Sequence, residues 1–148
     1  MNAIGKGSHP SVGVKMLDRD HDHLSEILEE IQFRAAAGLA GGRTVEMVRR
    51  LAQTMQAHFT LEEGMMALTR YPGTAIHRLQ HQLLVDQVNA LATQHGRNAR
   101  GLHAQLLNFF ANSHYKHIGD ADMDYGLWLS ATGPHFTDGA GGAAPSDL

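Results

Sequence analysis

The sequence contains no cysteine, which excludes disulfides, cysteine nucleophiles and thiolate metal ligands, so any metal must be bound by nitrogen and oxygen. It also lacks an apolar run of about 18 residues and a basic segment leading into an apolar stretch, so neither a membrane span nor a secretory signal is indicated. Lysine and arginine number only 12 and form no long block, which argues against a nucleic-acid partner. We therefore expect a cytoplasmic protein without a membrane or nucleic-acid partner.

Histidine is unusually frequent, with 11 residues against 12 Lys and Arg together. Because histidine is the commonest metal ligand in proteins, this excess favours a metal site. Scattered surface histidines would give the same count, so the positions of the histidines must decide.

Apolar residues recur at spacings of three and four in four segments, which is the pattern of amphipathic helices. The first segment begins at Leu17 and ends before the glycine-rich stretch 38–43, and the others span about 44–69, 75–95 and 102–131. Long helices joined by short loops pack as antiparallel neighbours. The sequence therefore predicts an all-α fold, an up-down-up-down antiparallel four-helix bundle over residues 14–131, with an extended N-terminal arm (1–13) and a flexible C-terminal tail (132–148). The positions assigned to the buried side are Leu17, His21, Leu24, Leu28 and Ile31; Val48, Met55, Phe59 and Met66; His77, His81, Leu84, Val88 and Leu91; and Leu106, Phe110, His117, Ala121 and Trp128.

Each predicted helix carries histidine on its buried side. His58 and Glu62 are four residues apart and so share one face, as do His77 and His81, while His21 and His117 belong to the first and fourth helices. In an antiparallel bundle these positions fall near one level. A single buried histidine is more often a hydrogen-bonded core residue, but burying this whole set without partners would cost several kcal/mol, which a bound cation offsets. Of the remaining histidines, we expect a solvated role for His9, His23, His95 and His135, and a solvated or loosely packed position for His103.

Three stretches carry a resemblance to a known family: "SVGVKMLDRDHDHL" (11–24), "HFTLEEGMM" followed by "HRLQH" within 58–81, and "HIGDAD" (117–122). Over about residues 11–130 the chain resembles the hemerythrin family, specifically a single-domain bacteriohemerythrin. The resemblance implies two iron ions (Fe²⁺/Fe³⁺) joined by an oxo or hydroxo bridge. It implies that one iron is bound by His77, His81 and His117 and the other by His21 and His58, that Glu62 and Asp122 bridge them, and that the second iron keeps an open position for O2. The same nitrogen and oxygen ligands could hold zinc or manganese.

Asp122 is the ligand on which resemblance and ideal geometry disagree. His117 and Asp122 lie about 140° apart around a regular α-helix, whereas Asp120 would lie closer to the face of His117. We follow the resemblance and predict a local π-type widening of the fourth helix between His117 and Asp122, a feature that often marks functional sites.

Two positions near the expected pocket depart from the family pattern. Many bacterial relatives have a tryptophan and an aliphatic residue where this chain has Ser113 and His114, so the wall of the pocket is expected to be smaller and more polar. His114 could hydrogen-bond a bound ligand or simply be a satisfied histidine against a neighbouring helix. Asp18 could orient His21 or only solvate the start of the first helix. The candidates for the apolar wall, each of which is also an ordinary core position, are Leu24, Met55, Phe59, Met66 and Phe110.

Three functions fit these expectations. The first, which we favour, is reversible dioxygen binding at the open iron for storage, delivery or sensing, with no catalytic residue. The second uses the same centre for peroxide or nitric oxide, as a peroxidase, a catalase-like protein or an NO-handling protein, and the Ser113–His114 pair favours it; azide would bind in vitro in either case. The third is a bundle that binds metal for stability alone, which we weight least because structural sites are coordinatively closed.

Overall fold

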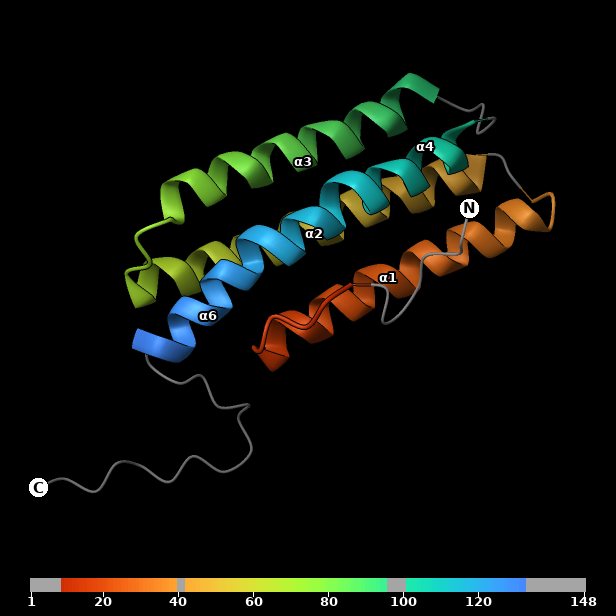
Figure 1. Ribbon diagram of the computed structural model, residues 1–148. Coiled ribbons are helices and arrows are strands. Elements are labelled where there is room, and N and C mark those ends of the chain that lie inside the picture. The colour runs from red at the N-terminus through yellow and green to blue at the C-terminus, as the bar shows by residue number, and fades with distance from the viewer. Residues whose placement is uncertain (1–8, 40–41, 96–100, 133–148) are drawn as a thin grey trace, which may run out of the picture.

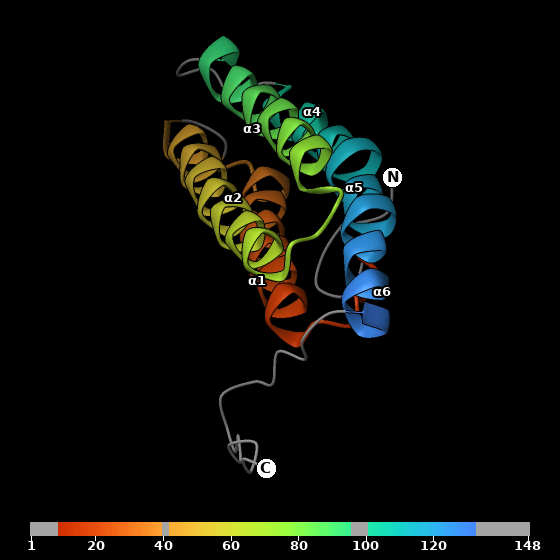
Figure 2. The same ribbon diagram turned by 90° about the vertical axis from the view of Figure 1, so that its left-hand side faces the viewer.

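The computed structural model describes residues 9–39, 42–95 and 101–132, and within them the chain forms an antiparallel bundle of four helical rods and no strand (Figure 1). The first three rods are α1 (Lys15–Ala36), α2 (Gly42–Thr69) and α3 (Thr74–His95). The fourth runs over residues 102–132 and comprises α4 (Leu102–Phe109), η1 (Phe110–His114), α5 (Tyr115–His117), η2 (Ile118–Asp122) and α6 (Met123–Thr132). α1 packs on α2, α2 on α3, and α4 on both α3 and α1, so the rods surround a common centre (Figure 2). The predicted four-helix bundle is confirmed.

The ends of the helices lie close to where the sequence placed them, for local reasons. α1 stops because Gly38 adopts the left-handed conformation with φ +71°, and the Leu39 N–H then bonds to the Arg34 carbonyl at 2.9 Å. α2 ends at Thr69 because Arg70 adopts the left-handed conformation with φ 58°, and the Tyr71 N–H then bonds to the Met66 carbonyl at 2.9 Å. None of the helices in the described ranges is long and apolar enough to cross a bilayer. The expected tail, and residues 1–8 of the arm, lie outside the described residues.

The apolar core has two parts separated by a layer of polar side chains. The larger cluster includes Leu24 of α1, Phe59 of α2 and Phe110 of η1, and the smaller one includes Leu17 and Ile118 at the other end of the bundle. His21 of α1 and His117 of the fourth rod lie between residues of the two clusters, and five further buried His, Glu and Asp side chains gather with them. We call this set the polar layer: His21, His58, Glu62, His77, His81, His117 and Asp122.

The fourth rod is not a regular α-helix. The π-helix predicted between His117 and Asp122 is confirmed as η2, in which the Met123 N–H reaches the Ile118 carbonyl five residues back. A second π-helix, η1, was not predicted; there the Tyr115 N–H reaches the Phe110 carbonyl.

The widened turns change which side of the fourth rod is buried. The α-helical spacing placed Ala121 and Trp128 on the buried side, but both are only half-buried. Each π-turn holds more residues than an α-turn and so rotates the following residues around the axis. The residues that are buried instead are Asp122, Tyr125, Gly126 and Leu129.

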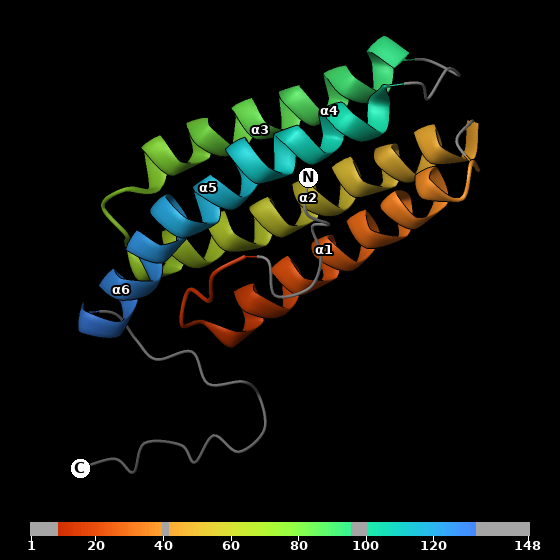
Figure 3. The same ribbon diagram turned by 45° about the vertical axis from the view of Figure 1, so that its right-hand side comes forward.

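The described part of the arm, residues 9–14, lies along α1 and reaches toward α6 (Figure 3). Val12 and Val14 are buried in the smaller apolar cluster. The Val12 carbonyl oxygen occupies the space where a Cβ on Gly126 would lie, so only glycine permits this contact between arm and helix. The arm is therefore packed as part of the core.

Candidate metal centre

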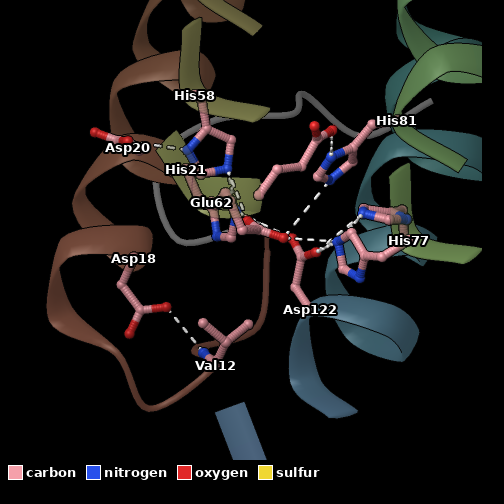
Figure 4. A network of polar contacts seen from close by, with 11 residues as sticks. Val12, Asp18, Asp20, His21, His58, Glu62, His77, His81 and Asp122 are labelled. Atoms are coloured by element: carbon pink, nitrogen blue, oxygen red, sulfur yellow. Dashed lines mark hydrogen bonds and ion pairs between the residues drawn. The ribbon is translucent and has the colours of Figure 1, made fainter. Parts of the chain in front are cut away.

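The polar layer brings together five imidazoles and two carboxylates from all four rods (Figure 4). Each of these seven side chains belongs to a residue that is at most 8% exposed. α1 supplies His21, α2 supplies His58 and Glu62, and α3 supplies His77 and His81, while α5 and η2 supply His117 and Asp122. All five imidazoles present Nε2 to the centre of the layer.

Glu62 lies between two groups of imidazoles and turns one carboxylate oxygen to each. Its Oε2 is 3.3 Å from Nε2 of His58. Its Oε1 is 2.7 Å from Nε2 of His77 and 3.6 Å from Nε2 of His81. One carboxylate therefore faces both groups of imidazoles and could serve a cation in each.

The two carboxylate oxygens of Asp122 likewise face different groups of imidazoles. Its Oδ2 is 3.2 Å from Nε2 of His21, and its Oδ1 is 2.9 Å from Nε2 of both His77 and His117. The π-turn of η2 makes this possible by bringing Asp122 to the side of His117, whereas Asp120 is exposed. The expected choice of Asp122 over Asp120 therefore agrees with the geometry.

The potential ligand atoms fall into two overlapping sets, and within each set they lie within 4.8 Å of one another. We call the first set, Glu62, His77, His81, His117 and Asp122, the three-histidine half. The second set, His21, His58, Glu62 and Asp122, is the two-histidine half.

The chemistry of these atoms fits cations. Within the part of the chain that the structure describes, the four carboxylate oxygens of Glu62 and Asp122 and Nε2 of His81 have no hydrogen bond of acceptable geometry, although nitrogens lie close to them. The Nε2 atoms of His21 and His58 are 3.1 Å apart, as are those of His77 and His117. Lone pairs that converge at such distances are costly in a dry interior unless protons or cations lie between them, and a cation in each half would satisfy them.

In the metal-free layer, protonated imidazoles lie next to ionised carboxylates. Burial alone lowers the pKa of His58, but hydrogen bonds to Asp20 and Glu62 outweigh it and raise the pKa to about 9. For His77 burial is likewise outweighed, by Asp122 and Glu62, and its pKa is also about 9. Burial raises the pKa of Glu62, yet the neighbouring imidazoles bring it below its usual value, and the pKa of Asp122 is lowered in the same way. Protons therefore hold the layer together where cations are absent.

Two further carboxylates orient the imidazoles from outside, and the sequence analysis missed both. Nδ1 of His58 donates to Oδ2 of Asp20 at 2.9 Å, and Nδ1 of His81 donates to Oε1 of Glu63 at 2.8 Å. A carboxylate can only accept, so each pair leaves the Nε2 lone pair free to bind metal. Arg78 lies 3.4 Å from the other oxygen of Glu63. Sequence position could have indicated these two carboxylates, because Asp20 is next to His21 and Glu63 is next to Glu62, both predicted ligands.

Asp18 does not have either role considered for it. Its Oδ1 accepts the Val12 N–H at 2.8 Å and its Oδ2 accepts the Ser11 hydroxyl at 2.6 Å, so the carboxylate fixes the arm to the start of α1 (Figure 4).

The expectation that His9 is solvated was wrong. Its side chain is 4% exposed and Nε2 lies 3.0 Å from Asp22, while its ring packs edge-on to His21 with centroids 5.4 Å apart. The arm passes over the two-histidine half, and no periodicity in residues 1–13 could have shown this. The expectation for His23 is confirmed, since its side chain is 55% exposed. His103 is half-buried, the side chain of His95 is not described, and His135 lies outside the described residues.

The expected pocket residues are buried around the layer. Leu24, Met55, Phe59 and Phe110 belong to the larger apolar cluster, and Met66 lies in the smaller one on the other side. Phe59 stacks on His81 with ring centroids 3.9 Å apart. Ser113 is half-buried. His114 is 1% exposed, and burial together with nearby His21 lowers its pKa well below the usual value, so it is a neutral imidazole.

Comparison with known proteins agrees with this geometry. The profile of the Hemerythrin HHE cation binding domain matches residues 12–129, which spans every residue of the polar layer. No curated protein and no solved structure matches the chain. Because the profile match covers most of the 148 residues and the cation-binding side chains meet in one buried layer, the chain belongs to the hemerythrin family of cation-binding domains.

Proposed function

We propose that this chain is a non-haem diiron protein that binds dioxygen reversibly, as a single-domain bacteriohemerythrin would. The observation that carries the proposal is the unequal division of the polar layer. Glu62 and Asp122 belong to both halves, but one half has three imidazoles and the other has two. A pair of like ions held this way has one ion with fewer protein ligands, and that ion is where a small molecule would bind.

Iron suits this ligand set, because imidazole and carboxylate together, without sulfur, are typical of non-haem iron sites. The iron pair would be held by His77, His81 and His117 on one side and by His21 and His58 on the other, with Glu62 and Asp122 between them. When bound in the ferrous state, two irons supply the two electrons that reversible dioxygen binding requires.

The protein around the layer supports binding rather than turnover. Leu24, Phe59 and Phe110 are each at most 1% exposed and close the side of the layer that faces the larger cluster. Apolar walls exclude water and limit proton delivery to a bound ligand, which slows its irreversible loss. Asp20 and Glu63 hold His58 and His81 in the tautomer that presents Nε2 to the layer.

One observation favours the second candidate, a diiron protein that processes peroxide or nitric oxide. A buried polar side chain, His114, interrupts the apolar wall. A group able to hydrogen-bond a bound peroxide promotes turnover, whereas an aliphatic residue at the same place would not.

The decisive experiment is to measure iron per chain, then record the visible spectrum of the reduced protein before exposure to air, after exposure, and after purging with argon. The proposal expects two irons per chain and a charge-transfer band that appears in air and disappears on purging. A band that decays without returning, together with rapid consumption of peroxide, would support the second candidate. Iron binding with no response to air or azide would indicate a structural metal and contradict both.

Variants make the iron measurement specific to the polar layer. His117→Ala removes an imidazole from the three-histidine half and should lower the iron content below two per chain. His23→Ala removes an exposed imidazole from the same bundle and should keep both irons. Equal iron content in the two variants would show that the bound metal is elsewhere.

A further inference from the structure

His114 is a buried imidazole that the ligand set does not use. Its residue is 1% exposed, and within residues 9–39, 42–95 and 101–132 neither ring nitrogen has a hydrogen-bond partner. Buried polar groups are nearly always paired, and each exception calls for an explanation. A leucine would fill similar space at this position without burying two polar atoms.

Two polar side chains in the same region, Tyr115 and His9, have partners other than His114 and do not explain it. The hydroxyl of Tyr115 lies 2.9 Å from the hydroxyl of Ser25. His9 directs Nε2 to Asp22 at 3.0 Å. Among the described residues, Nδ1 of the adjacent His21 is also without a partner, but Nε2 of His21 faces the polar layer, whereas both ring nitrogens of His114 remain available.

The ring of His114 faces the two-histidine half from the side of the larger apolar cluster. Its centroid is 6.4 Å from that of His21, and it also lies edge-on to Phe110 at 5.0 Å and tilted to Phe59 at 6.1 Å. His114 belongs to neither set of ligand atoms that lie within 4.8 Å of one another. It is close enough to reach a molecule bound at the two-histidine half but is not placed as one of the ligands.

The backbone explains how a residue so near the ligands stays outside their set. His114 ends η1, and η2 begins four residues later, so His117 lies between two π-turns. These turns rotate His117 and Asp122 into the layer while His114 stays over its edge, toward α1. π-turns inside helices are frequent at functional sites.

We propose that His114 is the ligand-recognition residue of this centre: its neutral imidazole N–H donates a hydrogen bond to the outer atom of a small anion bound at the two-histidine half. The inference rests on the diiron function proposed above and adds a preference to it. Ligands that accept a hydrogen bond at the end away from the metal, as azide does, gain affinity, whereas ligands without such an acceptor do not.

The test uses the iron-loaded, oxidised protein and azide, whose binding is followed through the visible absorption band. His114→Leu keeps the volume and removes the donor, and we expect azide affinity to fall about tenfold, the equivalent of about 1.4 kcal/mol, as for loss of one hydrogen bond to a charged acceptor. His114→Gln keeps an N–H donor and should recover most of that loss. His103→Leu is the matched control. Nε2 of His103 is also buried without a partner among the described residues, but His103 lies in α4, near the far end of the fourth rod. This substitution should leave azide affinity unchanged.

A second measurement needs no metal. Thermal unfolding of the metal-free protein should show a midpoint several degrees higher for His114→Leu, roughly 3–6 °C, because the substitution removes two unpaired buried polar atoms. A lower midpoint would mean that His114 has a packing role in the bundle and would overturn the proposal.

The outcomes separate the two proposals. If every variant binds two irons and azide affinity is unchanged in His114→Leu, the proposed role of His114 is wrong and the diiron function still stands. Loss of one iron in His114→Leu shows that His114 is a metal ligand, which also overturns the role proposed here. Absence of iron from the unaltered protein overturns both proposals.

Discussion

The two halves of the polar layer are built differently, although they share Glu62 and Asp122. In the three-histidine half, α3 contributes an i, i+4 pair, Phe59 stacks on His81, and Glu63 with Arg78 supports that ligand from the surface. Among the described residues, the imidazoles in ring contact with one another in this half are His77, His81 and His117, which all belong to the set. In the two-histidine half, the neighbouring imidazoles include His9 and His114, which are not in the set. This difference is what the proposed function requires, with one half anchoring metal and the other meeting a small ligand.

The largest effect should come from the carboxylate that joins the halves. Glu62→Gln replaces one of the two carboxylate oxygens with an NH2 group that cannot bind metal, so one half loses a ligand and the other keeps only a neutral amide oxygen. We expect iron to fall from two to fewer than one per chain, measured by elemental analysis on protein whose helical circular dichroism is unchanged. Glu46→Gln makes the same chemical change at an exposed position of the same helix, outside the layer, and should retain both irons. If Glu62→Gln also retained both, the shared-carboxylate description would be wrong.

The outer carboxylates should separate the halves. Glu63→Gln acts on His81 in the three-histidine half, and Asp20→Asn acts on His58 in the two-histidine half. Loss of such a partner typically lowers metal affinity about 10–100-fold, which competition with a chelator measures. Only Asp20→Asn should also change azide affinity, because only His58 belongs to the half where azide would bind. Equal effects of both variants on azide would argue against an open position confined to one half.

The residues that could be predicted from sequence are those set by local periodicity. The four rods and the positions of His58, Glu62, His77 and His81 follow from spacings of three and four residues, which place side chains on one face whatever the tertiary context. Asp122 required more, because a regular helix would have favoured Asp120. The conflict between a five-residue spacing and helical geometry was itself the signal for η2.

The residues that could not be predicted depend on contacts between elements. Asp20 and Glu63 lie on partly exposed positions and are selected only by the helix that packs opposite them. His9 is buried because the arm folds back over α1, and residues 1–13 have no periodicity to indicate that. η1 could not be predicted because no two expected metal ligands flank it at a spacing that conflicts with a regular α-helix. For His114 the spacing was compatible with both a pocket residue and an ordinary core histidine. Neither buried ring nitrogen has a partner among the described residues, which favours the pocket role proposed above.

The arm offers a test of whether the two-histidine half depends on its cover. Gly126→Ala places a methyl group where the Val12 carbonyl oxygen lies, so the arm must shift, at a cost of about 1–3 kcal/mol in unfolding free energy. Because His9 packs on His21, the shift should also alter azide binding, while the iron content stays at two. Gly64→Ala is the control: a Cβ there meets nothing within 4 Å, and alanine in a helix interior should stabilise the protein by about 0.5–1 kcal/mol. Destabilisation by both substitutions would show that helix context, and not the arm, determines the effect.

The last prediction concerns protons, which should act on both halves equally. In the metal-free protein the pKa of His58 and of His77, one from each half, is raised from 6.5 to about 9, so each contributes stability that is fully present below pH 6.5 and lost as the pH rises through 9. Glu62 and Asp122 have lowered pKa values, so their effect on stability runs the other way. Their contribution to stability is present above pH 4.5 and is lost as the pH falls. The unfolding midpoint of the metal-free protein should therefore be highest between these limits and decline from pH 6.5 to 9. Metal displaces the protons from both histidines, so ferrous iron added at pH 7.5 should release about two protons per chain, measurable by calorimetry in buffers of different ionisation enthalpy. Release of only one would show that the halves differ in charge as well as in ligand number.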